Sequence, residues 1–115
     1  MSFRWPVKDP DEQLDYSVDW SRFLVDATIS SVVWHVKSNT YSTKTVLASG
    51  ETLTTASDSA VTDSIQNVSQ TNTDTVATIN IGGGTNNAEY TFFCRMVDST
   101  GSQAERSVKL RLKER

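Results

Sequence analysis

The sequence predicts an all-β protein, an immunoglobulin-like β-sandwich of about seven strands with an extended N-terminal arm. Three observations carry this prediction. Short segments that alternate apolar and polar residues recur along the chain, turn-forming residues separate most of them, and no long stretch has helical periodicity. The 30 serines and threonines, with 12 valines, favour strands. The 115 residues suffice for one domain, which we place at residues 14–115 behind an arm at residues 1–13.

The arm has no periodicity and holds both prolines of the chain, each of which favours extended backbone. Its aromatic residues suit docking onto another chain, so removal of residues 2–12 is expected to leave a folded domain. The alternative is that the arm folds back over an open end of its own domain. The predicted partner contacts are Phe3, Arg4, Trp5, Pro6, Lys8 and Asp9.

The first two predicted strands cover residues 14–20 and 28–37. The alternation of the first is strict, which is the period of a strand with one buried face. In the second, Ile29 and Val33 fall on the outer parity and predict a bulge or a partly covered outer face. The residues expected to face the core are Leu14, Tyr16, Val18, Trp20, Val32, Trp34 and Val36.

The middle of the chain is harder to interpret. A weaker strand is predicted at residues 45–48, closed by Ser49 and Gly50. Within residues 51–75 the apolar positions Val61, Ile65 and Val68 have helical spacing, but the surrounding serines and threonines favour a short strand or a surface loop equally well. The sequence therefore does not decide whether this segment is a helix, a short strand or a surface loop.

The last third predicts strands at residues 75–81, 88–97 and 104–112. Three glycines at 82–84 end the first of these in a turn that needs positive backbone angles. Trp34 and Tyr90 would fit the core tryptophan and the corner tyrosine of immunoglobulin-like folds. Cys94 is the single cysteine, so no internal disulfide is possible, and we expect it to be a small buried apolar side chain.

The charges are unevenly placed, with six acidic residues in the first 26 positions and five basic residues in the last ten. If the first and last strands lie side by side, the charges of the two strands would face each other and set their register. The alternative is that the same charges pair between neighbouring subunits. The residues concerned are Asp15, Asp19, Lys109, Arg111 and Lys113.

Reactive groups are scarce, and we predict no enzyme, no metal site and no cofactor. His35 is the only histidine and lies on the opposite parity from the core residues, which argues against a dyad with Cys94, and one His and one Cys cannot build a zinc site. A net charge of -3 and a pI near 5.0 argue against nucleic-acid binding. No apolar run approaches the roughly 20 residues of a membrane span, and residues 1–10 contain no signal-peptide core.

Two groups of segments resemble small structural virion proteins of tailed bacteriophages. The opening residues 5–12, WPVKDPDE, continue to Leu14-Asp15-Tyr16 and Asp19-Trp20. The closing segments are Gly82-Gly83-Gly84-Thr85, Tyr90-Thr91, Ser99-Thr100-Gly101 and Glu105-Arg106-Ser107-Val108. The resemblance covers about half the chain and implies an immunoglobulin-like structural piece of the particle at the head, the neck or the tail.

We therefore expect a non-enzymatic virion component, made in the bacterial host cytoplasm and present in several symmetry-related copies at the head-to-tail neck or collar. Its expected partners are other virion proteins, namely neck, portal-adjacent, tail or major capsid subunits. One alternative is a capsid decoration or cement protein. A second is a carbohydrate-binding adhesion module, against which the inward parity of Trp20 and Trp34 counts.

Overall fold

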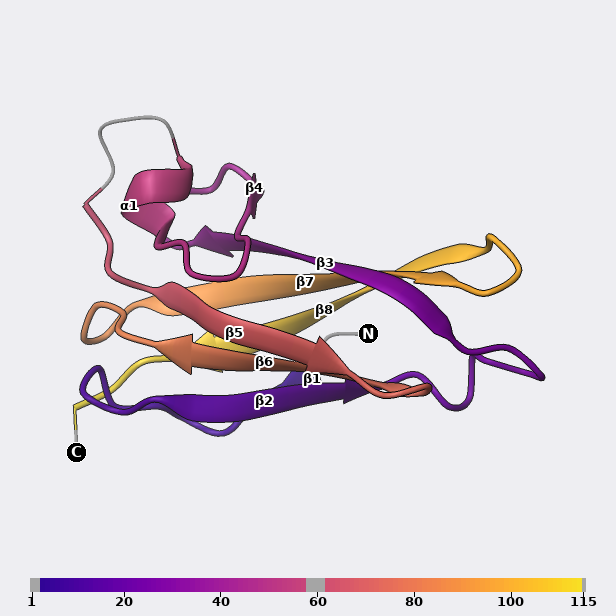
Figure 1. Cartoon of the computed structure of the whole chain (residues 1–115). Helices are drawn as coiled ribbons and strands as arrows, with labels where there is room; N and C mark the ends of the chain where they lie inside the picture. The colour runs from indigo at the N-terminus through magenta and orange to yellow at the C-terminus, as the bar shows by residue number, and fades with distance from the viewer. Residues whose placement is uncertain (1–2, 58–61, 115) are drawn as a thin grey trace.

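The computed structural model describes residues 3–57 and 62–114, with only the backbone of Phe3, and shows an all-β chain folded into two sheets (Figure 1). The larger sheet has the order β1-β8-β7-β3-β4 and the smaller one β2-β6-β5. All neighbouring strands are antiparallel except β1 and β8. The strands are β1 (Phe3–Arg4), β2 (Leu14–Asp19), β3 (Ile29–Ser38), β4 (Thr45–Val46), β5 (Gln66–Asn72), β6 (Val76–Gly82), β7 (Glu89–Asp98) and β8 (Gln103–Arg111).

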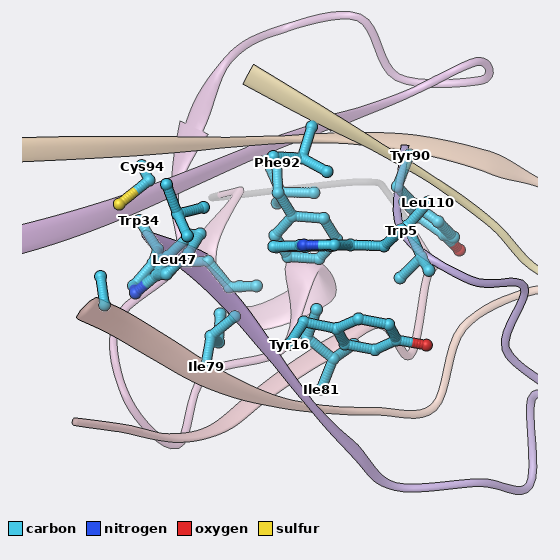
Figure 2. Close-up of a cluster of buried hydrophobic side chains, with 14 of the residues drawn as sticks. Trp5, Tyr16, Trp34, Leu47, Ile79, Ile81, Tyr90, Phe92, Cys94 and Leu110 are labelled. Atoms are coloured by element: carbon cyan, nitrogen blue, oxygen red, sulfur yellow. The ribbon is translucent and has the colours of Figure 1, made fainter. Parts of the chain in front are cut away.

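The core lies between the two sheets because alternate side chains of facing strands point inward. The larger sheet contributes Trp34 and Phe92, and the smaller sheet contributes Ile79 and Ile81, all at most 1% exposed (Figure 2). Cys94 is fully buried opposite Trp34 in the register of β3 and β7, which confirms the expected buried cysteine. Burial of each such side chain contributes about 1.5 to 3 kcal/mol relative to exposure.

The predicted strands at 14–20, 28–37, 75–81, 88–97 and 104–112 correspond to β2, β3, β6, β7 and β8. The register of β3 with β7 shifts between Ile29 and Ser31, where the sequence predicts a bulge. The strand predicted at 45–48 is only the two residues of β4. Gly83 and Gly84 have positive φ angles, and a Cβ at Gly83 would overlap the carbonyl oxygen of Ser64, so this turn requires glycine.

The segment that the sequence leaves open contains one helical turn, α1 (Leu53–Ala56), and the edge strand β5. A capping box of Thr52 and Thr55 holds the helical turn, and Leu53 anchors it in the core. Buried Asn67 donates from Nδ2 to the carbonyl oxygen of Leu47 at 2.9 Å, which ties β5 to the end of β4. Val61, one of the three residues with helical spacing, lies outside the described residues.

The N-terminal segment is packed against its own domain. Its backbone follows β8, with Trp5 N donating to Lys109 O at 2.9 Å and Lys8 N to Arg111 O at 3.1 Å. The Trp5 ring is 9% exposed and stacks on Tyr16 with ring centroids 4.9 Å apart (Figure 2). The prediction of an arm outside the sandwich is thus corrected to the alternative, because the ring fills space between the sheets.

Tyr90 makes a buried polar contact in the core. Its hydroxyl donates to the Asp63 carboxylate, with both oxygens 2.8 Å away, and accepts a hydrogen bond from Thr85 N at 2.9 Å. One side chain therefore joins β7 to the segment before β5 and to the turn after β6. Burial raises the pKa of Tyr90 well above its usual value near 10, since the phenolate would lose its hydration.

Replacement of Trp5 by Ala should lower the free energy of unfolding by about 3 to 5 kcal/mol, because it empties the space between the sheets. Trp5→Phe should cost less, and the exposed neighbour Val7→Ala should change little. Urea unfolding followed by tryptophan fluorescence and circular dichroism measures all three variants. Equal stability of Trp5→Ala and the wild type would show that the segment does not pack as described.

Tyr90→Phe should cost about 1 to 3 kcal/mol at neutral pH, because buried Asp63 loses a hydrogen-bond donor. The folded phenol keeps its proton above pH ~10 while the unfolded phenol releases it, so wild-type stability should fall as pH rises beyond this value. This loss should be shallower in Tyr90→Phe. Urea unfolding at neutral pH and at pH ~10.5, with Tyr41→Phe as control, tests both statements, and identical alkaline slopes would contradict them.

Candidate interaction surfaces

The residues predicted to contact a partner divide into a buried and an exposed set. Trp5 and Lys8 are buried, whereas Arg4 and Pro6 are exposed and Asp9 is half-buried. Arg4 pairs with Glu89 at 3.1 Å across the larger sheet. The side chain of Phe3 lies outside the described part of the chain. Only the exposed set could touch another protein without unfolding the segment.

Lys8 fastens the N-terminal segment to the glycine turn. Its Nζ donates to the carbonyl oxygens of Gly83 at 2.6 Å and Asp9 at 2.9 Å, and its side chain is fully enclosed. Burial lowers its pKa, and attraction from nearby Glu12, Asp9 and Asp11 offsets part of that effect. In sequence this lysine looks like one charge in a mixed charged run, and no local pattern marks it as buried.

The predicted pairing of acidic and basic residues between the first and last predicted strands is wrong within the chain. Asp15 and Asp19 lie on β2 in the smaller sheet, whereas Lys109 and Arg111 lie on β8 in the larger one. The carboxylate of Asp15 accepts a hydrogen bond from Asn80, and Lys109 lies 3.8 Å from Glu89. Lys113 is exposed just beyond β8.

The side chain that links β8 to β2 is Arg106, which the sequence interpretation missed. Its Nη1 donates to the carbonyl oxygen of Asp19 at 3.1 Å, and its guanidinium lies 4.8 Å from the centre of the Trp20 ring. Hydrogen bonds from Ser21 lower the pKa of Asp19, with Arg106 contributing further. An arginine close to an aromatic face makes a cation–π contact.

The two side chains considered for nucleophilic chemistry lie on opposite faces of the larger sheet, Cys94 inward and His35 outward. Burial raises the pKa of Cys94 to about 11, and burial lowers that of His35. Within residues 3–57 and 62–114 no group of three or more His, Cys, Asp or Glu side chains could hold a metal ion. The same residues include no helix that is long and apolar enough to span a bilayer.

The outer face of the larger sheet gathers charged side chains from several strands. We call it the basic face, and Phe93 lies near its centre between outward residues of β3 and β8. Its two acidic residues are Glu89 and Glu105. Its six basic residues are Arg4, Lys37, Lys44, Arg95, Lys109 and Arg111.

A second exposed surface is the loop from β2 to β3, where Phe23 is 42% and Val25 78% exposed. This loop lies at the same end of the sandwich as the β5–β6 and β7–β8 turns (Figure 1). Backbone hydrogen bonds join the three, from Ser99 N to Thr28 O at 2.8 Å and from Ile29 N to Asp74 O at 2.9 Å. Phe23 and Val25 therefore lie in a loop whose end is fixed by hydrogen bonds to two neighbouring turns.

Comparison with known protein families finds a match to the family described as podophage GP4 fiber-tail adaptor protein gp77. It covers residues 8–46 and 39–111, two overlapping segments that together include every strand except β1. The chain belongs to the gp77 family. No curated protein and no solved structure matches it.

Membership of the gp77 family makes the chain a structural component of a tailed-phage virion and confirms that part of the resemblance. The match includes the middle segment, 40–75, to which the sequence resemblance did not extend. It also covers the loop end and every residue of the basic face except Arg4. These two surfaces are the candidate sites of this gp77-family member.

Cys94 should react slowly with a thiol reagent in the folded protein. At pH ~8 a thiol with a pKa of about 11 is almost wholly protonated, and its sulfur is also inaccessible. Labelling with a chromogenic disulfide reagent should be complete within minutes in denaturant and take far longer without it. Rapid stoichiometric labelling of the native protein would contradict this burial.

Proposed function

We propose that this chain is a non-enzymatic adaptor that joins a fibre to the tail of a podophage-like virion. The observation that carries the proposal is the gp77-family match over residues 8–111, since that family is described as a fiber-tail adaptor. The structure supports it with two exposed surfaces of different character, the basic face and the apolar loop end. An adaptor needs at least two such surfaces to contact two proteins at once.

We infer further that the sandwich is immunoglobulin-like. In such folds the second and fifth strands pair in one sheet, while the third, sixth and seventh form the other. The strand groups β2-β6-β5 and β3-β7-β8 have this arrangement. In this numbering β1 is the first strand, β4 is an added edge strand that is not counted, and β8 is the seventh strand. A sandwich of this kind is a rigid module that presents loops at its ends and flat faces at its sides.

The position in the particle follows from the adaptor role. We place the chain at the tail, at or below the head-to-tail neck or collar, in several symmetry-related copies, after synthesis in the host cytoplasm. The family description favours this site over the capsid surface, where a decoration protein would lie. A carbohydrate-binding platform has little support, because Trp5, Trp20 and Trp34 are all buried.

Contact of the N-terminal segment with a neighbouring subunit remains part of the proposal, restricted to its exposed side. Arg4 and Pro6 are exposed, and half-buried Asp9 lies at the turn that follows. Trp5 and Lys8 would then act indirectly by holding these residues on the surface. Pairing of Asp15, Asp19, Lys109, Arg111 or Lys113 with a neighbour is likewise a proposal.

Deletion of the gene from its phage should yield particles with heads and tails but without attached fibres, and a plasmid copy should restore the fibres. Electron microscopy counts fibres, and quantitative mass spectrometry gives the copy number per particle. About a dozen copies or fewer agrees with a tail adaptor. Fully fibred mutant particles, or hundreds of copies spread over the shell, would overturn the proposal.

A further inference from the structure

We propose that the basic face binds a carboxylate-rich surface on a virion protein partner. This inference rests on the proposed adaptor function and names the surface that carries one of its two contacts. The face belongs to the central strands β3, β7 and β8 of the larger sheet, so its side chains stand on a rigid support. A flat sheet face with fixed charge positions suits electrostatic recognition of another protein.

The charge of this face contrasts with that of the whole chain. Six of the 11 basic residues of the sequence lie here, but only two of the 14 acidic residues, although the net charge of the protein is -3. The opposite face, on the smaller sheet, presents Asp15 and Asp19 among hydroxyl and amide side chains. The chain is therefore electrostatically polarised across the sandwich.

The two acidic residues are already paired within the face. Glu89 lies 3.1 Å from Arg4 and 3.8 Å from Lys109, and Glu105 contacts Lys44 at 2.7 Å and Arg95 at 3.6 Å. Lys37 and Arg111 form no ion pair with any residue in 3–57 or 62–114. These two cations supply the positive charge that remains for a partner.

Phe93 contributes an apolar group at the centre of the charges. The Nζ atoms of Lys44 and Lys37 lie 4.6 and 5.8 Å from its ring centroid, so the ring helps to position both ammonium groups. A hollow of about 280 Å³ on this face is lined by Lys37, Glu89, Thr91 and Lys109 among others. Because Glu89 already pairs with Lys109, a carboxylate side chain that entered the hollow would meet Lys37 as its unpaired cation.

The titration of His35 agrees with a positive local potential. Burial is the main cause of its lowered pKa, and repulsion from Lys44 and Arg95 adds to it, while Glu105 acts in the opposite direction. His35 faces Phe93 across the β3–β7 pair on this same outer surface. A net positive field at this position is what an acidic partner would be attracted to.

A carboxylate surface on a protein fits these features better than nucleic acid does. Nucleic-acid binding depends on many cations along a row of phosphates, whereas this face has two cations outside its own ion pairs, Lys37 and Arg111, and the protein carries a net charge of -3. A second copy of the chain offers Asp15 and Asp19 on the broad face of its smaller sheet, and Asp9 and Glu12 beside Lys8, where both already accept backbone hydrogen bonds. The partner is therefore expected to be a different virion protein with clustered Asp and Glu side chains.

The test measures binding of the purified protein to tail particles isolated from phage that lack its gene. Lys37→Glu and Arg111→Glu, made separately, should each weaken binding at least about tenfold, whereas Lys37→Arg should retain it. Wild-type binding should also weaken as ionic strength rises. The matched control is Ser69→Glu with Thr71→Glu, which gives the same change in net charge on the outer face of the smaller sheet.

The outcomes separate this inference from the adaptor function. Binding by the wild type and equally by Lys37→Glu and Arg111→Glu, with unchanged folding by circular dichroism, would overturn the basic face as the docking surface and leave the adaptor intact. No binding by the wild type would count against the adaptor function itself. Sedimentation velocity measures self-association of the wild type and the variants, and a gel-shift assay measures their binding to duplex DNA. Charge-dependent self-association, or DNA binding lost in the same variants, would overturn the choice of partner.

Discussion

The rest of the structure depends on the contact that Trp5 makes with both sheets. Its backbone nitrogen donates to Lys109 on β8, and its indole Nε1 donates to the carbonyl oxygen of Ser17 on β2 at 3.2 Å. The sheets have no strand in common, so such side-chain bridges hold their neighbouring edges together. Arg106 makes a second bridge of this kind, to Asp19 at the end of β2. The segment that the sequence predicts as an arm is therefore part of the sandwich and links its two sheets.

The sequence predicts most strands because one buried face imposes strict alternation, as in β2 from Leu14 to Asp19. Prediction from the sequence fails where contacts between distant parts of the chain determine the structure. β1 has two residues and no alternation to detect, and the backbone and Lys8 bonds that hold this segment go to Lys109, Arg111 and Gly83, which are far away in the sequence. The single turn of α1 is likewise held by a cap and by Leu53, not by helical propensity.

The failed charge prediction has an energetic explanation. An exposed ion pair contributes only about 0.2 to 1 kcal/mol, whereas a large side chain buried in the core contributes about 1.5 to 3 kcal/mol. Core burial therefore decides the strand pairing, so Tyr16 and Val18 determine where β2 lies and Asp15 and Asp19 follow it. The basic face could be predicted only once the neighbours of β7 were known, since its cations come from separate parts of the sequence.

The two exposed surfaces suit an adaptor because they depend on different physical interactions. The basic face relies on charge, which salt screens, whereas Phe23 and Val25 at the loop end rely on burial of apolar area, which salt does not weaken. Backbone hydrogen bonds from Ser99 and Ile29 hold the loop end in place. The basic face lies on the central strands of the larger sheet, which fix the positions of its side chains. In the proposed adaptor, contacts of different physical origin on one rigid body would let one contact change without weakening the other.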